Sequence, residues 1–142
     1  CRRVGRHEGA LFTDFKRHTI LSPQVGFGKN GFGVDYGRFN VTHDPADMYK
    51  FRTPPLINVS LTGPYSHSGS VLELKDIVVN HFDPFRTTDM RKLDDVQRRE
   101  FYAQVRASGT DDIVPAYLDE QELSELMSFL ETLTSMTSPS GT

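Results

Sequence analysis

Residues 51–81 read FRTPPLINVSLTGPYSHSGSVLELKDIVVNH, and this stretch decides the fold. Its first part contains three prolines and two glycines, which forbid a continuous helix and favour a rigid loop. Its second part carries apolar residues at helical spacing, which predicts a helix over residues 71–82 with His81 on its buried face. An ordered loop that leads into a short apolar helix ending on a histidine is therefore the central feature of the chain.

Two later segments also have helical patterns. Residues 93–107 are predicted to be a helix with a weak apolar stripe. Residues 119–133 form the clearest helix, because Asp119 and Glu122 make a capping pair and leucines then recur on one face. We find no convincing strand alternation and no internal repeat, so the sequence predicts an all-α domain with long irregular loops.

The loops and the ends of the chain complete this organisation. Residues 22–38 are Gly-rich but lack the flanking strand, helix and Lys-Ser/Thr pair of a phosphate-binding loop. Loops this long are uncommon in a compact domain unless something organises them, and a large flat cofactor would do so. We expect one domain over residues 1–134 and a disordered Ser/Thr/Pro/Gly-rich tail over residues 135–142.

Composition excludes several classes of protein. The 142 residues suffice for one domain with a core, and the net charge of -3 is too small to indicate a nucleic-acid partner. No apolar run is long enough to cross a membrane, and the single cysteine, Cys1, cannot form a disulfide within the chain. The start without Met or an apolar leader predicts a fragment or a processed product. Acidic residues gather after Arg106, either as a solvated helix face, which we favour, or as a docking patch for a basic redox partner.

A histidine at position 81 allows two interpretations when only its spacing is considered. A lone histidine on an apolar helix face is more often a hydrogen-bonded core residue than a ligand. A second candidate is the group His43, Asp44 and Asp47, which lie close to one another in the sequence. This group lacks the helical spacing of a metal site and is predicted to form a turn. Spacing alone therefore leaves the role of His81 open.

The loop and helix together resemble one family of proteins. Residues 51–69 are similar to F-x-T-P-x-L-R-N-V-x-L-T-x-P-Y-x-H-D-G, and the helix is similar to L-x-x-V-V-x-x followed by a haem ligand. These motifs belong to the bacterial di-haem cytochrome c peroxidases and their MauG-like relatives. The resemblance implies a cytochrome c-like C-terminal haem domain over residues 5–134. His81 stands where peroxidases carry Met and MauG-type proteins carry Tyr, so it implies a bis-histidine iron of lowered reduction potential.

The N-terminal segment carries the matching first ligand. Residues 7–14 resemble C-H-x-G-x-x-F-T-D, which implies that His7 is the proximal haem ligand. A c-type haem is attached through C-x-x-C-H, but Arg3 and Arg6 stand at the two cysteine positions and Cys1 lies farther out. Three arrangements stay open: haem held by axial ligation and packing, haem attached through Cys1 alone, or a degenerate site without haem.

The resemblance also assigns roles within the loop. Ile57 replaces the family's Arg, which lies near a haem propionate, so Arg52 or Arg38 is expected to compensate. In relatives, backbone carbonyls corresponding to those of Thr62 and Pro64 help to bind calcium between two haem domains.

Three further residues match family positions with two interpretations each. Tyr65 and His67 match P-Y-x-H and either lock the loop or take part in the chemistry. His18, matching a later family histidine, is either a surface residue or packs near the cofactor.

The leading prediction is an electron-transfer haem domain of a peroxidase-like oxidoreductase. It would relay electrons to a peroxidatic haem in a separate N-terminal domain, and this chain alone would be inactive. We expect that domain and a small redox protein as partners, a homodimer as a candidate assembly, no membrane insertion, and, by resemblance, a periplasmic location. The alternatives are a haem-free structural or interaction module of the same fold and a MauG-like enzyme that oxidises a protein.

Overall fold

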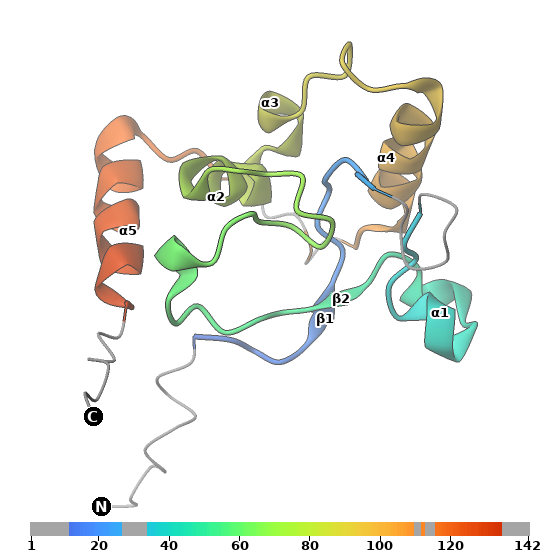
Figure 1. Ribbon diagram of the computed structural model, residues 1–142, viewed down its shortest axis with the longest axis horizontal. Coiled ribbons are helices and arrows are strands. Elements are labelled where there is room, and N and C mark those ends of the chain that lie inside the picture. Colours follow the sequence, from blue (N-terminus) through green and yellow to red (C-terminus); the bar gives the residue numbers. More distant parts are fainter. Residues whose placement is uncertain (1–11, 27–33, 110–111, 113–115, 135–142) are drawn as a thin grey trace, which may run out of the picture.

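The structure is a computed structural model that describes residues 12–26, 34–109, 112 and 116–134. The described part is mostly helical and has one very small sheet (Figure 1). In chain order the elements are β1 (Arg17–His18), α1 (Phe39–Thr42), the 3₁₀ turn η1 (Pro45–Asp47), β2 (Phe51–Arg52), the 3₁₀ turn η2 (Val59–Leu61), α2 (Leu74–Phe82), α3 (Pro84–Thr87), α4 (Asp95–Ala107) and α5 (Glu120–Thr132). The all-α prediction is therefore confirmed. The predicted tail over residues 135–142 lies outside the described residues.

The two longest helices begin where the sequence indicates. Asp94 and Asp119 are the N-caps of α4 and α5, and each helix has a complete capping box. In α5 the Asp119 side chain accepts from the Glu122 N–H at 2.8 Å, while the Glu122 carboxylate accepts from the Asp119 N–H at 3.0 Å. These bonds satisfy N–H groups that have no partner inside the helix. The apolar stripe of α5 is confirmed, with Leu123 and Leu130 buried.

The β1–β2 pair and the short helices α1 and α3 were not predicted from the sequence. The strands are antiparallel, and the register pairs Arg17 with Arg52 and His18 with Phe51. Two residues per strand are too few to produce an alternation that a sequence pattern could reveal. The pairing nevertheless joins the N-terminal segment to the start of the long loop.

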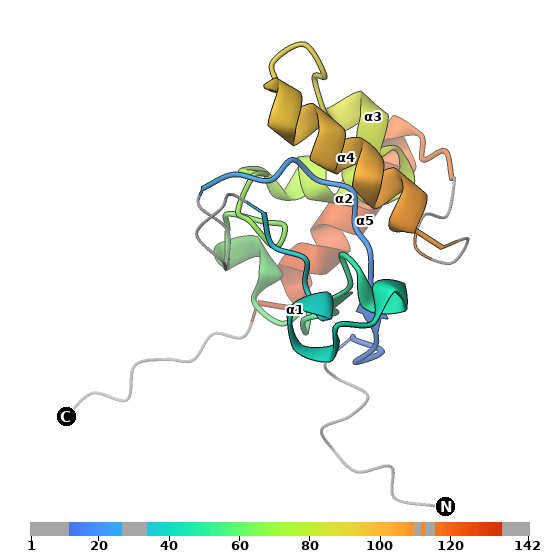
Figure 2. The same ribbon diagram turned by 90° about the vertical axis from the view of Figure 1, so that its right-hand side faces the viewer.

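The core lies between α4 and the segment that follows β1. Phe101 of α4 is completely buried and packs edge-on against Phe85 of α3, with ring centroids 5.5 Å apart. The buried Ser22 N–H donates to the Gln104 side chain of α4 at 3.1 Å. Helix α2 lies between α4 and α5 in Figure 1, and in the turned view of Figure 2 α4 passes in front of α2. Within the described residues, no helix is long and apolar enough to span a membrane.

The long loop before α2 is ordered by its own hydrogen bonds. The Tyr65 backbone pairs with that of Val71, and the Tyr65 hydroxyl donates to the Val59 carbonyl at 2.8 Å. The Asn58 N–H donates to the Leu133 carbonyl at 3.1 Å, which joins η2 to the end of α5. The prediction of a rigid loop is therefore correct, although it also contains short helical turns.

Candidate functional site

His81 lies on the last turn of α2, but its side chain is exposed. The prediction that it occupies the buried face is wrong. The buried positions of α2 are Ile77 and Asn80, and Asn80 donates to the Thr87 hydroxyl at 2.9 Å, where α3 packs against α2. Adjacent residues on a helix are about 100° apart, so burial of Asn80 turns His81 toward the edge of the packed side. The spacing correctly predicted a helix, but packing against α3 determines which of its residues are buried.

One nitrogen of the His81 ring makes a hydrogen bond, and the other has no hydrogen-bond partner in the part of the chain that the structure describes. Its Nδ1 lies 2.7 Å from the Ile77 carbonyl oxygen, which can only accept, so Nδ1 carries the proton. The lone pair is then on Nε2. A histidine that donates one N–H to a backbone carbonyl is the usual form of a metal ligand, because the bond fixes both the tautomer and the ring orientation. The donor chemistry of His81 therefore fits the iron of a haem.

Apolar side chains are exposed on the loop and on α5. Leu61 and Leu72 are 71% and 75% exposed, and Leu61 belongs to η2, which packs against α5. Phe129 of α5 meets Phe12 edge-on at 5.6 Å, and both rings are also exposed. This is apolar surface of the kind that a flat cofactor or a neighbouring domain covers.

The two arginines predicted to meet a propionate line one surface hollow of about 310 Å³. Arg38 donates from Nε to an Asp47 carboxylate oxygen at 2.9 Å, and the Arg52 guanidinium lies 5.2 Å from the centre of the Phe15 ring. The structure thus brings Arg38 and Arg52 together. His81 and Tyr65 do not line this hollow.

Tyr65 and His67 have structural contacts. The Tyr65 hydroxyl is engaged by the Val59 carbonyl. The His67 ring stacks on Phe51 at 3.9 Å with an interplanar angle of 13°, and its Nε2 lies 3.0 Å from the side-chain oxygen of the buried Gln24. Burial lowers the pKa of His67 below its ordinary value. These contacts support the loop-locking interpretation of both residues.

Three polar contacts were not predicted from the sequence. His18 lies between two carboxylates, with Nε2 2.8 Å from Asp14 and Nδ1 3.1 Å from Asp112. The hydrogen bonds to Asp14 and then Asp112 raise the pKa of His18. The buried Tyr49 donates its hydroxyl to Glu100 of α4 at 2.5 Å. Large sequence separations hide the contacts of His18 with Asp112 and of Tyr49 with Glu100, whereas Asp14 lies only four positions from His18.

The remaining predicted site residues lie either in the loop before α2 or outside the described residues. Thr62 and Pro64 are both exposed in the loop. His7 and Cys1 lie outside the described residues. The segment around His43 is a turn, as predicted, because Asp44 caps η1. Among the residues that the structure describes, no three His, Cys, Asp or Glu side chains gather in a way that could hold a metal ion.

Comparisons with known proteins all lead to one family. The chain is 61% identical to the cytochrome c551 peroxidase of Pseudomonas aeruginosa over 44 residues, which cover 31% of this chain and 13% of that protein. It is 33% identical to the cytochrome-c peroxidase IdrP1 of Pseudomonas sp. (strain SCT) over 109 residues, covering 75% of this chain and 23% of that protein. It is 27% identical to the methylamine utilization protein MauG of Paracoccus denitrificans, covering 94% of this chain and 37% of that protein.

A solved structure gives the same result. A MauG-like protein associated with microbial copper homeostasis matches the fold with a TM-score of 0.65 and 28% identity, over 89% of this chain and 38% of that one. No protein-family model matches the chain. The relatives named above are much longer, since the chain spans only 13% to 37% of their lengths. The fold is cytochrome c-like, and the chain belongs to the di-haem cytochrome c peroxidase and MauG-like family, of whose longer members it matches a portion.

Proposed function

We propose that this chain is the electron-transfer haem domain of a di-haem peroxidase-like oxidoreductase. The observation that carries the proposal is the hydrogen bonding of His81. Its Nδ1 donates to the Ile77 carbonyl, which leaves the lone pair of Nε2 to bind iron. Family membership supports the same role, because relatives are cytochrome c peroxidases and MauG. A bound haem would supply one-electron redox chemistry.

The residues of this chain would hold and tune the haem. His81 would be one axial ligand and His7 the other, and the hydrogen bond to Ile77 would increase the basicity of the His81 imidazole. Two imidazoles favour a lower reduction potential than an imidazole and a Met thioether. Arg38 or Arg52 would be the candidate partner of a propionate, since both are cationic residues of one hollow.

A calcium ion is a second component of the proposal. The backbone carbonyls of Thr62 and Pro64 would be ligands, because calcium prefers oxygen donors. Neither carbonyl accepts a hydrogen bond from another described residue, so both are available. Two carbonyls do not complete a calcium site, and the other ligands would come from outside this chain.

The proposal includes partners for the domain, and the chain's limited share of its relatives' length supports a further haem domain among them. The peroxidatic haem would belong to another part of the protein, so this chain alone would not reduce peroxide. A small redox protein would be the electron donor, the assembly could be a homodimer, and the location would be the periplasm.

The proposal is tested by the visible spectrum of the chain expressed with haem maturation enzymes. We expect a Soret band and a six-coordinate low-spin spectrum, and intact mass would tell whether the haem is covalent. His81→Ala should give a five-coordinate spectrum, while His43→Ala, a matched change of another exposed histidine, should not. A colourless protein of apoprotein mass, or an unchanged His81→Ala spectrum, would contradict the proposal.

A haem-free structural or interaction module is the second candidate. The observation that favours it is the presence of Arg3 and Arg6 where covalent attachment requires cysteines. A MauG-like protein-oxidising role is a variant of the first proposal, supported by the match to MauG over 94% of this chain. The same spectrum separates the haem-free module from both haem-dependent roles.

A further inference from the structure

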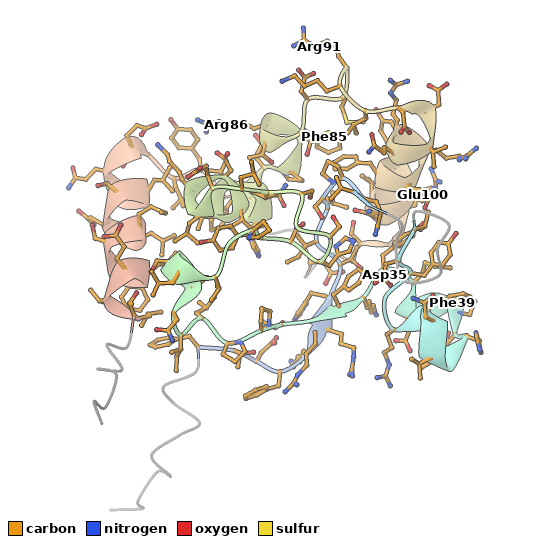
Figure 3. All side chains as sticks on the ribbon, viewed as in Figure 1. Asp35, Phe39, Phe85, Arg86, Arg91 and Glu100 are labelled. Atoms are coloured by element: carbon orange, nitrogen blue, oxygen red, sulfur yellow. The ribbon has the colours of Figure 1, made fainter. Side chains whose placement is uncertain are left out.

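Cationic side chains from three elements converge on the hollow beside the small sheet. It is lined by Arg17 of β1, Arg52 of β2, Lys50 just before β2, and Arg38 at the start of α1. One carboxylate, Asp35, also lines it. Figure 3 labels Asp35 and, nearby, Phe39 of α1, which mark this region of the molecule.

The register of the sheet places two like charges opposite each other. Arg17 and Arg52 are direct cross-strand partners, so their side chains leave the same face of the sheet. Like charges in this position destabilise a strand pair. Neither guanidinium has an ion-pair partner among the described residues, so the structure itself does not neutralise them.

The nearby carboxylates are already engaged elsewhere. One oxygen of Asp35 accepts from the Gly37 N–H and from the Asn40 side chain, both at 2.8 Å. Asp47 accepts from Arg38 and from the Thr42 hydroxyl, which hold it beside α1. Arg17, Arg38, Lys50 and Arg52 line the hollow, against Asp35 in its lining and Asp47 beside Arg38, so its positive charge exceeds its negative charge.

The walls of the hollow are also held in place. The Arg38 N–H donates to the Lys50 carbonyl at 2.9 Å, and Gly37 forms an isolated bridge with Lys50. The Arg52 guanidinium lies over the Phe15 ring, 5.2 Å from its centre, in a cation–π contact. Donors that are fixed before binding lose less entropy when a ligand arrives.

We propose that this hollow binds a small free oxyanion of the phosphate or sulfate class, bridging Arg17 and Arg52 with Lys50 beside them. Guanidinium groups suit such anions because their planar N–H pairs match two oxygens at once. A volume of about 310 Å³ is ample for an anion of this size. The site shares Arg38 and Arg52 with the proposed propionate contact, so the two proposals compete for this hollow, and the haem arm of the test below separates them.

The test is a titration of the 142-residue, haem-free chain with inorganic phosphate at constant ionic strength, maintained with chloride. We expect saturable shifts of the arginine Nε–H resonances, with a dissociation constant on the order of 1 mM. Arg17→Gln should weaken binding roughly tenfold, because one charged hydrogen-bond partner is lost. Arg91→Gln is the control, since Arg91 lies at the far end of the molecule in Figure 3 and pairs locally with Asp89.

A second measurement, of thermal stability, tests the same site if the shifts of the arginine resonances are small. In phosphate-free buffer of low salt, Arg17→Gln should raise the melting temperature, and in saturating phosphate this advantage should disappear. Equal shifts with chloride and phosphate, or equal weakening by Arg91→Gln, would overturn the proposal. Binding of an acidic peptide but not of phosphate would assign the hollow to a protein partner instead. Loss of phosphate binding on addition of haem would assign it to the propionates.

Discussion

Gly37 offers a sharp test of the packing that supports the cationic hollow. Its φ is +63°, in the left-handed region, and an added Cβ would lie 2.5 Å from the Lys50 carbonyl oxygen and 3.0 Å from the carbonyl carbon. A left-handed conformation costs a residue with a Cβ about 1–2 kcal/mol. The contact with backbone is too short to be relieved by a side-chain rotation, and overpacking of this kind costs about 1–3 kcal/mol. Gly37→Ala should therefore destabilise the chain by about 2–5 kcal/mol.

Gly26→Ala is the matched control for this change. Gly26 also has a left-handed backbone, with φ +77°, but no atom of the described residues lies within 4 Å of an added Cβ. It should lose only the conformational part, about 1–2 kcal/mol. The assay is urea unfolding followed by far-UV circular dichroism, with the slope against urea unchanged. If both variants lose the same free energy, the close approach of Gly37 to Lys50 is not a real constraint.

Three other predictions concern the core, a helix cap and pH. Phe101→Ala should cost about 3–5 kcal/mol in urea unfolding, because the side chain is completely buried. Asp119→Ala should cost about 1 kcal/mol by loss of the capping box, measured the same way, and Asp119→Asn should recover most of it. Asp14 and Asp112 raise the folded-state pKa of His18, so protonated His18 stabilises the folded chain. This stabilisation is complete below about pH 6.5 and is lost as pH rises through the raised pKa. Unfolding measured from pH 5.5 to 8.5 should show that loss in the native chain but not in His18→Gln.

Local signals in the sequence predicted the helices well. The capping pair and leucine spacing of α5 depend only on neighbours in the chain, so both could be read correctly. The same holds for the turn chemistry of the loop before α2. For α2 the period was right and Ile77 is buried, but His81 is exposed, because Asn80 rather than His81 contacts Thr87 of α3. A helical period does not show which neighbouring element packs against which face of the helix.

Contacts between distant parts of the chain were beyond the sequence. Tyr49 and Glu100 are 51 positions apart, and His18 and Asp112 are 94 apart. Neither pair belongs to a motif, so only the fold reveals them. The β1–β2 pair was also beyond the sequence, because its two-residue strands are recognised only from their pairing with each other.

The described part of the chain has a small core for its length. Its buried apolar side chains are Leu21, Val34, Tyr49, Ile77, Phe101, Leu123 and Leu130. Long loops with exposed apolar residues such as Leu61 and Leu72 face away from that core. Any group that covers this surface in the folded state but not in the unfolded chain stabilises the fold by mass action. The proposed haem at His81 would be one such group, and the proposed neighbouring domain would be another. Stability that rises with haem addition would therefore favour the cofactor, whereas stability independent of haem would leave the covering of these loops to protein.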